Sequence, residues 1–239
     1  MISDPGKEVQ AMKKGWIAVL ALAAVLAAGP YAAGTTQAER QAPLAADDSY
    51  RLASSAVFYL RALGADGAVG ATGTGVLLSA RGDAATAYHV VKGAAKLEAV
   101  LADGKTVSPV KVVRYDERTD AAVLELPAPK SGGGYPFVAR RAEKLEHGDA
   151  VYAIGYPLKQ TPIVTQGIVS SPDAVVNGRS RVLIDAAIAS GMSGGPLLDE
   201  QGRLAGIISG SLRTMAGIHL AVGMADLNAL LPDGLRTAD

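Results

Sequence analysis

The sequence contains no cysteine, which excludes a disulfide framework, a metal site made of thiolates and a cysteine nucleophile. Its three histidines leave little for a metal cluster, so no metal and no cofactor is expected. An excess of one charge is also missing, because 23 Lys and Arg residues balance 23 Asp and Glu residues. This balance argues against nucleic acid or an anionic membrane surface as a partner. Any chemistry must therefore use oxygen and imidazole groups.

A long hydrophobic run is missing as well. The apolar stretch 16–28 follows Lys13 and Lys14 and precedes small residues such as Gly29 and Gly34. It is shorter than the roughly 20 residues that a membrane-spanning helix needs, which favours a cleaved signal peptide over an anchor. We expect residues 1–34 to be a signal peptide or membrane anchor, and residues 35–49 to be a linker.

The body of the chain has the pattern of an all-β protein. Short runs rich in Val, Ile, Leu and Tyr alternate with Gly, Pro, Asn and Asp, as in antiparallel sandwiches and barrels. Segment 130–136 divides the predicted strands into two sets of six. The one predicted helix is 224–231, where apolar residues share a helical face. The predicted strands are 54–61, 73–79, 84–88, 96–101, 106–115, 121–126, 149–155, 162–170, 181–186, 195–198, 203–210 and 218–223.

A serine stands among glycines in the run 191–196, Gly-Met-Ser-Gly-Gly-Pro. By itself Gly-x-Ser-x-Gly fits a loop without chemistry, the nucleophile elbow of an α/β-hydrolase, or the serine loop of a double β-barrel hydrolase. The α/β-hydrolase order of serine, acid and histidine would require Asp199 and His219, together with helices and a parallel sheet that the pattern lacks. The order His89, Asp120, Ser193 favours the double barrel.

These residue types can form a nucleophilic site. Serine is a poor nucleophile at neutral pH, so Ser193 needs a base, and His89 would take its proton and return it to the leaving group. Asp120 would hold the imidazole in one tautomer. The backbone N–H groups of Gly191 and Ser193 would bind the developing oxyanion. Alone, His89 fits a core histidine and Asp120 a turn acid; their joint order favours catalysis. His147 is expected in a solvated turn and Asp199 in a hairpin turn.

Five motifs in one order resemble the trypsin-like serine proteases, and among them the HtrA/Deg-type bacterial branch. The resemblance covers residues 50–231. It implies an all-β fold of two six-stranded antiparallel Greek-key barrels with a short C-terminal helix, in a domain at 50–235 (barrel 1 about 50–128, barrel 2 about 145–223). The motifs are the strand 74–78, the histidine motif 86–91, the stretch 116–124 with two aspartates, the pair 154–157 and 164–170, and the serine loop 185–197.

The resemblance also implies a function. It predicts a secreted or membrane-tethered serine endopeptidase of the bacterial periplasm or cell envelope, which hydrolyses extended or unfolded polypeptides through an acyl-enzyme. The alternative is a latent or pseudo-protease scaffold that binds peptides or a partner. Two positions depart from the family: Met192 replaces the usual Asn or Asp, and Tyr88 precedes the histidine. No PDZ domain is expected after residue 231, and a homo-oligomer stays open, because residues 40–55 do not decide it.

Substrate contacts follow only from the resemblance. It places the floor of the specificity pocket near Ala187 and its walls near 207–211 and 219–221, so the expected substrate-binding residues are Ala187, Ile208, Ser209, Gly210 and His219. For His219 a purely structural role is the competing interpretation. A specificity pocket whose floor has no carboxylate is unsuited to a Lys or Arg side chain of the substrate. It favours small or medium aliphatic side chains. The substrate backbone would add as a strand along 208–210.

Overall fold

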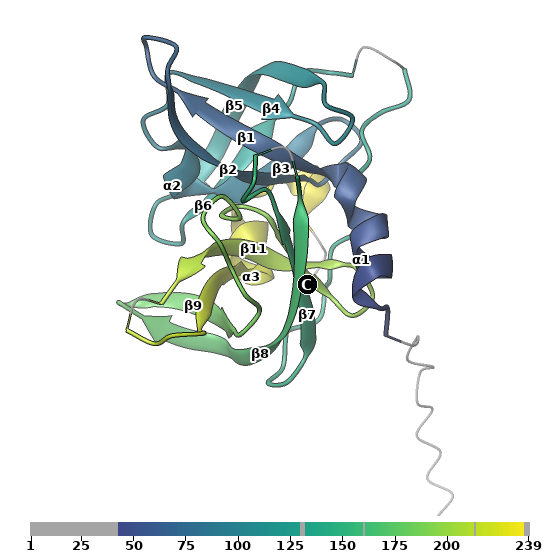
Figure 1. The fold of residues 1–239 in the computed structure, drawn as a ribbon, viewed down its shortest axis with the longest axis vertical. Coiled ribbons are helices and arrows are strands. Elements are labelled where there is room, and N and C mark those ends of the chain that lie inside the picture. Colours follow the sequence, from purple (N-terminus) through teal and green to yellow (C-terminus); the bar gives the residue numbers. More distant parts are fainter. Residues whose placement is uncertain (1–42, 130–131, 160, 213, 237–239) are drawn as a thin grey trace, which may run out of the picture. The chain divides into compact units, whose positions relative to one another are not determined.

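The structure, a computed structural model, describes residues 43–129, 132–159, 161–212 and 214–236. The predicted segment 1–34 and most of the predicted linker lie outside these residues. Two sets of strands and a few short helices make up the described chain (Figure 1). The helices are α1 (Ala46–Ala53), α2 (Tyr88–Val91) and α3 (Met224–Leu230), with 3₁₀ turns at Ser54–Ala56 and Asp233–Leu235.

The strands close into two six-stranded antiparallel barrels, which confirms the predicted fold class. The first barrel has the strand order β1-β2-β3-β6-β5-β4 and the second β10-β11-β12-β9-β8-β7. The first contains β1 (Val57–Leu63), β2 (Val69–Leu77), β3 (Asp83–Ala87), β4 (Lys96–Val100), β5 (Thr106–Asp116) and β6 (Ala121–Glu125). The second contains β7 (Ala150–Gly155), β8 (Ile163–Val176), β9 (Arg179–Ile184), β10 (Pro196–Asp199), β11 (Leu204–Ser211) and β12 (His219–Gly223).

Each barrel is filled by the apolar side chains that alternate along its strands. In the second barrel these include Val182 and Ile184 of β9, Ile208 of β11 and Ala221 of β12. The core of the first barrel continues into the region between the barrels, where Leu227 of α3 is fully buried. The C-terminal helix packs against β5, β6, β11 and β12, so it ties the two barrels together.

Two helices depart from the prediction that only 224–231 is helical. The helix α1 buries Ser49 and Ala53, and such small residues leave little apolar signal in a sequence. It begins within the range expected to be a linker, and just before it Leu44 O accepts a hydrogen bond from the Tyr152 hydroxyl at 2.7 Å. The helix α2 takes Tyr88 from the end of a predicted strand.

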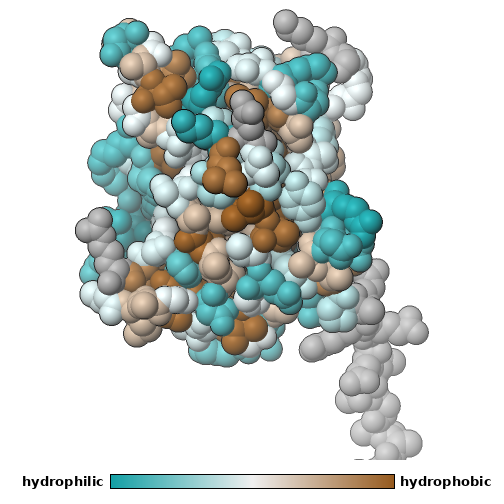
Figure 2. Space-filling view, in the orientation of Figure 1, coloured by the Kyte–Doolittle hydropathy of each residue, from teal (hydrophilic) through white to brown (hydrophobic). Residues whose placement is uncertain are grey.

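The surface of the barrels is mixed. On the face drawn in Figure 2, apolar residues gather near the middle and hydrophilic ones surround them. The large apolar side chains with the highest exposure among the described residues are Val175, at 77%, and Leu158, at 67%. No helix within the described ranges has the length and apolar character needed to cross a membrane.

Candidate active site

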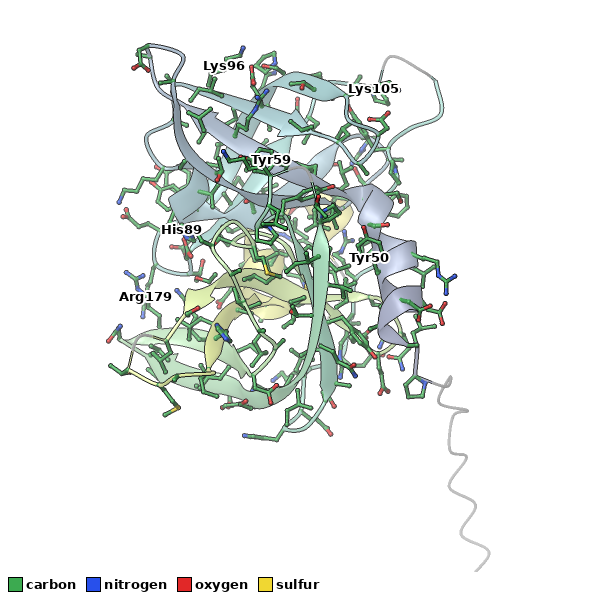
Figure 3. All side chains as sticks on the ribbon, viewed as in Figure 1. Tyr50, Tyr59, His89, Lys96, Lys105 and Arg179 are labelled. Atoms are coloured by element: carbon green, nitrogen blue, oxygen red, sulfur yellow. The ribbon has the colours of Figure 1, made fainter. Side chains whose placement is uncertain are left out.

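His89 and Asp120 are joined by several hydrogen bonds in the first barrel. His89 lies on the single turn α2, at the level where the two barrels meet (Figure 3). Asp120 precedes β6 and has a positive φ of 62°, a conformation that Asp tolerates better than most residues. Its Oδ2 lies 2.9 Å from His89 Nδ1, and its Oδ1 accepts a bond from the His89 backbone N–H at 2.9 Å. Its carbonyl oxygen accepts a bond from the Tyr88 N–H.

These contacts fix both the imidazole and its carboxylate. The Asp120 side chain is 13% exposed and the His89 side chain 49%. Burial by itself would raise the pKa of Asp120, but the hydrogen bonds from His89 and Ser209 outweigh burial and hold that pKa below its usual value. Asp120 is therefore an acceptor at neutral pH. Its position requires the proton of the neutral imidazole to lie on Nδ1, which leaves Nε2 as the base.

Ser209 of β11 connects this pair to Ser193. The Ser209 hydroxyl donates to Asp120 Oδ2 at 2.5 Å, and the Ser209 carbonyl oxygen accepts a bond from the Ser193 hydroxyl at 3.4 Å. Among the described residues, no hydrogen bond joins Ser193 Oγ directly to His89. The structure thus brings the three residues of the predicted triad to one place, with the Ser193 hydroxyl turned toward β11. A rotation about the Ser193 side-chain bond is a fast motion.

Among residues 191–195, next to Ser193, two backbone N–H groups have no acceptor within the described residues. The N–H groups of Met192, Gly194 and Gly195 donate to the carbonyl oxygens of Ala189, Ile208 and Met192. Within the described residues, the N–H groups of Gly191 and Ser193 donate to no acceptor. They are the two groups that the sequence assigned to the oxyanion. Two neighbouring N–H groups without an internal acceptor form a suitable site for a developing negative charge.

The glycines of this loop are required by its close contacts. Gly191 has a φ of 96°, and a Cβ at this position would lie 2.7 Å from Tyr156 O. Gly194 has a φ of 85°, and a Cβ there would lie 2.1 Å from Thr86 Oγ1 and 2.7 Å from the backbone N of Ala87. The serine loop therefore packs directly against the segment that leads into His89.

Thr74 of β2 fixes the loop from the other barrel. Its fully buried hydroxyl donates to Gly191 O at 2.7 Å and accepts a bond from the Tyr156 N–H at 2.9 Å. Its backbone N–H donates to Ser193 O at 2.8 Å. One residue thus orients the Gly191–Met192 peptide and the Ser193–Gly194 peptide. Sequence analysis missed this role; the available signal was a single threonine between two glycines of an apolar strand.

Met192 is anchored in the core of the second barrel. Its side chain is fully buried in the apolar cluster of that barrel, and its sulfur accepts a bond from the Ala189 N–H. A Cβ on Gly155 would lie 2.8 Å from the Met192 Cα, so this position leaves no room for a larger neighbour. The residue that departs from the family pattern therefore holds the loop by apolar packing rather than by a charge.

The expected substrate-binding residues lie on two segments beside Ser193. Ala187 is exposed on the loop between β9 and Ser193. Gly210 lies next to Ser209 on β11, and His219 begins the neighbouring strand β12. Ile208 is fully buried, so it contributes its backbone to this region and its side chain to the barrel core.

Two polar residues lie outside this site. Asp199 is fully buried at a hairpin, where it bonds to Arg203 at 2.8 Å, and His147 is exposed before the start of β7. Asp199 is therefore engaged elsewhere and does not face His219 as an α/β-hydrolase arrangement would require.

Comparison with known proteins agrees with this geometry. Residues 73–207 match the family model described as a trypsin-like peptidase domain, which is more than half of the chain. The chain belongs to the trypsin-like peptidase family. A solved structure of a serine endoprotease from Yersinia pestis aligns with a TM-score of 0.68 and 29% identity, over 79% of this chain and 66% of that one.

Curated relatives of this trypsin-like chain belong to the HtrA/Deg type. A probable periplasmic serine endoprotease, DegP-like, from Chlamydia trachomatis is 35% identical over 64% of this chain and 31% of its own length. The serine endoprotease DegS from Escherichia coli K12 is 37% identical over 56% of this chain and 38% of its own length. The chain thus spans about a third of the length of these relatives.

Proposed function

We propose that this chain is a serine endopeptidase whose catalytic residues are His89, Asp120 and Ser193. The observation that supports it most is the connected set of hydrogen bonds from His89 through Asp120 and Ser209 to Ser193. This set crosses from one barrel to the other and ends beside the N–H groups of Gly191 and Ser193, for which the described part of the chain offers no acceptor. A binding scaffold has no physical need for such an arrangement.

The proposed reaction proceeds in two halves. His89 Nε2 takes the Ser193 proton while Oγ bonds to the scissile carbonyl carbon, and the N–H groups of Gly191 and Ser193 stabilise the oxyanion. Collapse of this intermediate breaks the C–N bond, and His89 gives the proton to the leaving amine. Water then attacks the acyl-enzyme with the same base, which releases the acid and restores Ser193. Asp120 stabilises the imidazolium in both halves.

The substrates that we propose are extended or unfolded polypeptides. The end of β11, where Ser209 and Gly210 are partly buried and Ser211 is exposed, offers backbone groups to which an extended chain can add as a strand. The relatives named as periplasmic endoproteases support a location in the periplasm or cell envelope. Residues 1–34 would export or tether the chain, and the mass of its mature N-terminus distinguishes these outcomes. Light scattering tests whether the chain forms a homo-oligomer.

One observation favours the second candidate, a latent scaffold that binds peptides. The Ser193 hydroxyl bonds to Ser209 O rather than to His89 in this structure. A scaffold in which this rotamer is fixed would bind extended chains without cleaving them. The two candidates therefore differ in whether Ser193 reacts.

A fluorophosphonate probe separates the candidates, because it reacts covalently with an activated serine. We expect about one label per chain for the wild type and none for Ser193→Ala or His89→Ala. Ser180→Ala is the matched control, since Ser180 is an exposed serine on β9 away from the site, and it should label like the wild type. Equal labelling of the wild type and Ser193→Ala would overturn the enzyme proposal and favour the scaffold.

A further inference from the structure

A histidine and a serine form a polar pair on β12 and β11, next to the candidate active site. Ser211 Oγ lies 2.8 Å from His219 Nδ1, and the two residues are directly opposite each other in the strand register. Ser211 is exposed and His219 is partly buried. The proposed catalytic steps use neither side chain.

The register directs His219 toward the inside of the second barrel. His219 pairs with Ile184 of β9, and two residues later Ala221 pairs with Val182. Ile184, Val182 and Ala221 all belong to the apolar core of this barrel. Because side chains two residues apart on a strand share a face, His219 lies on this inner face at the end of the barrel.

That end of the barrel is also where the two segments of the candidate site begin. The loop that leads to Ser193 leaves β9 directly after Ile184, which is the partner of His219. On the other side of β12, Ser211 lies two residues beyond Ser209, whose carbonyl oxygen bonds to Ser193 Oγ. His219 therefore lies between the loop and the strand that would enclose the substrate residue whose carbonyl is attacked, called P1.

The surroundings of this pair favour a negatively charged partner. In the described residues, His219 Nε2 has no hydrogen-bond partner, and β11 and β12 carry no other charged or titratable side chain. On β9, Arg179 and Arg181 lie at the far end of the strand. Asp185 follows β9, but its Oδ1 is turned to β8, where it accepts a bond from the Ile168 N–H at 2.7 Å. Asp185 is thus the one described carboxylate next to this end of β9, and one of its oxygens is already bonded to β8.

We propose that His219 and Ser211 bind the side-chain carboxylate of an acidic P1 residue, glutamate or aspartate. The inference rests on the proposed function and specifies its substrate class. In the imidazolium form, His219 Nδ1–H donates to Ser211 Oγ, so His219 Nε2–H and the Ser211 hydroxyl can both donate to the carboxylate oxygens. An aliphatic P1 residue would instead bury the Nε2–H without a partner, which is unfavourable. This proposal differs from the preference for small or medium aliphatic side chains that is expected from Ala187 alone.

Peptides that differ only at P1 test the proposal. We expect the full chain to cleave an internally quenched peptide with Glu at P1 with a kcat/KM about tenfold or more above that of the Leu and Lys peptides at pH 6. Gln at P1 has nearly the same shape without the charge, so it should be cleaved more slowly than Glu. A preference for Leu or Lys over Glu would overturn the proposal.

The pH dependence of the Glu to Gln ratio provides a second readout. Burial lowers the pKa of free His219, whereas a bound carboxylate would stabilise its cation and raise that pKa. The ratio should therefore rise as the pH falls below the ordinary imidazole value of about 6.5, by roughly fivefold between pH 8 and pH 5. Any pH dependence of the catalytic steps that the two peptides share cancels in the ratio. A ratio that does not change with pH contradicts the proposal.

Variants of His219 and Ser211 test whether these two residues cause the preference for Glu and its pH dependence. His219→Gln should remove the pH dependence of the ratio, and Ser211→Ala, at an exposed position, should reduce the preference for Glu. His147→Gln is the matched control, because His147 is an exposed histidine outside this region. This variant should keep both the pH dependence of the ratio and the preference for Glu. Fluorophosphonate labelling is measured on every variant. Labelled protein without a Glu preference overturns only the specificity proposal, whereas absence of labelling in the wild type overturns the proposed function.

Discussion

The Ser209 hydroxyl donates a hydrogen bond of 2.5 Å to Asp120 Oδ2, from a strand of the second barrel to a carboxylate of the first. Asp120 thus receives donors from both barrels, His89 on one side and Ser209 on the other. The position of His89 therefore depends on how the two barrels pack. This relationship connects the stability of the interface between the barrels with the proposed chemistry.

Replacement of Ser209 by Ala should lower kcat about tenfold with little change in KM, because the carboxylate is no longer held in the position that orients His89. With one donor fewer, Asp120 should stabilise the His89 cation more strongly. The acidic limb of the profile of kcat/KM against pH should then move to higher pH. Steady-state kinetics from pH 5 to pH 9 measures both effects. Ser209→Thr keeps a hydroxyl and should restore most of kcat; an unshifted profile in Ser209→Ala would argue against this role.

Replacement of Asp120 by Asn should lower kcat by about 10⁴, because the amide favours the wrong imidazole tautomer. It should also lower the free energy of unfolding at pH 7 by about 1–3 kcal/mol, through loss of charge-assisted hydrogen bonds.

The pKa of Asp120 is depressed in the folded state, so its contribution to stability is complete above the unfolded value of about 3.9. The contribution is lost as the pH falls through the lower folded value. Urea unfolding at pH 7 and at pH 3 should therefore show a smaller difference between wild type and Asp120→Asn at pH 3. An equal difference at both pH values would contradict the linkage.

Replacement of Met192 by Ala should lower the free energy of unfolding by about 2–5 kcal/mol, because it leaves a cavity in the second barrel. It should also slow fluorophosphonate labelling, since the loop that carries the free N–H groups loses its anchor. Met192→Leu conserves volume and should cost less than about 1.5 kcal/mol, with labelling near that of the wild type. Rapid labelling of a folded Met192→Ala protein would mean that packing does not order the loop.

Replacement of Thr74 by Val should lower kcat, because Gly191 O and the Tyr156 N–H both lose their buried partner. The expected cost in the free energy of unfolding is about 1–3 kcal/mol. Thr74→Ser retains the hydroxyl and is the matched comparison for both quantities. If Thr74→Val kept the kcat of the Ser variant, the hydroxyl would not orient the oxyanion loop.

The sequence predicted eleven of the twelve strands to within four residues at each end, and it predicted α3; for β8 it missed the last six residues, up to Val176. Alternation of apolar and polar side chains has the same period as a strand, and turn residues mark its ends, so this information is local. The single turn α2 was not predicted because Val90 and Val91 favour a strand. Its first N–H groups are held by Asp120, which lies 31 positions away from His89.

For the candidate site, the order of His89, Asp120 and Ser193 was readable from the sequence, as was the run of glycines around the serine. The sequence determined by itself which residue types are available and which strands they follow. Only the tertiary structure decided that Ser209 and Thr74 bridge the barrels, that Met192 lies in a core, and that Ser211 faces His219. These contacts depend on how two closed barrels pack, and no local periodicity encodes that packing.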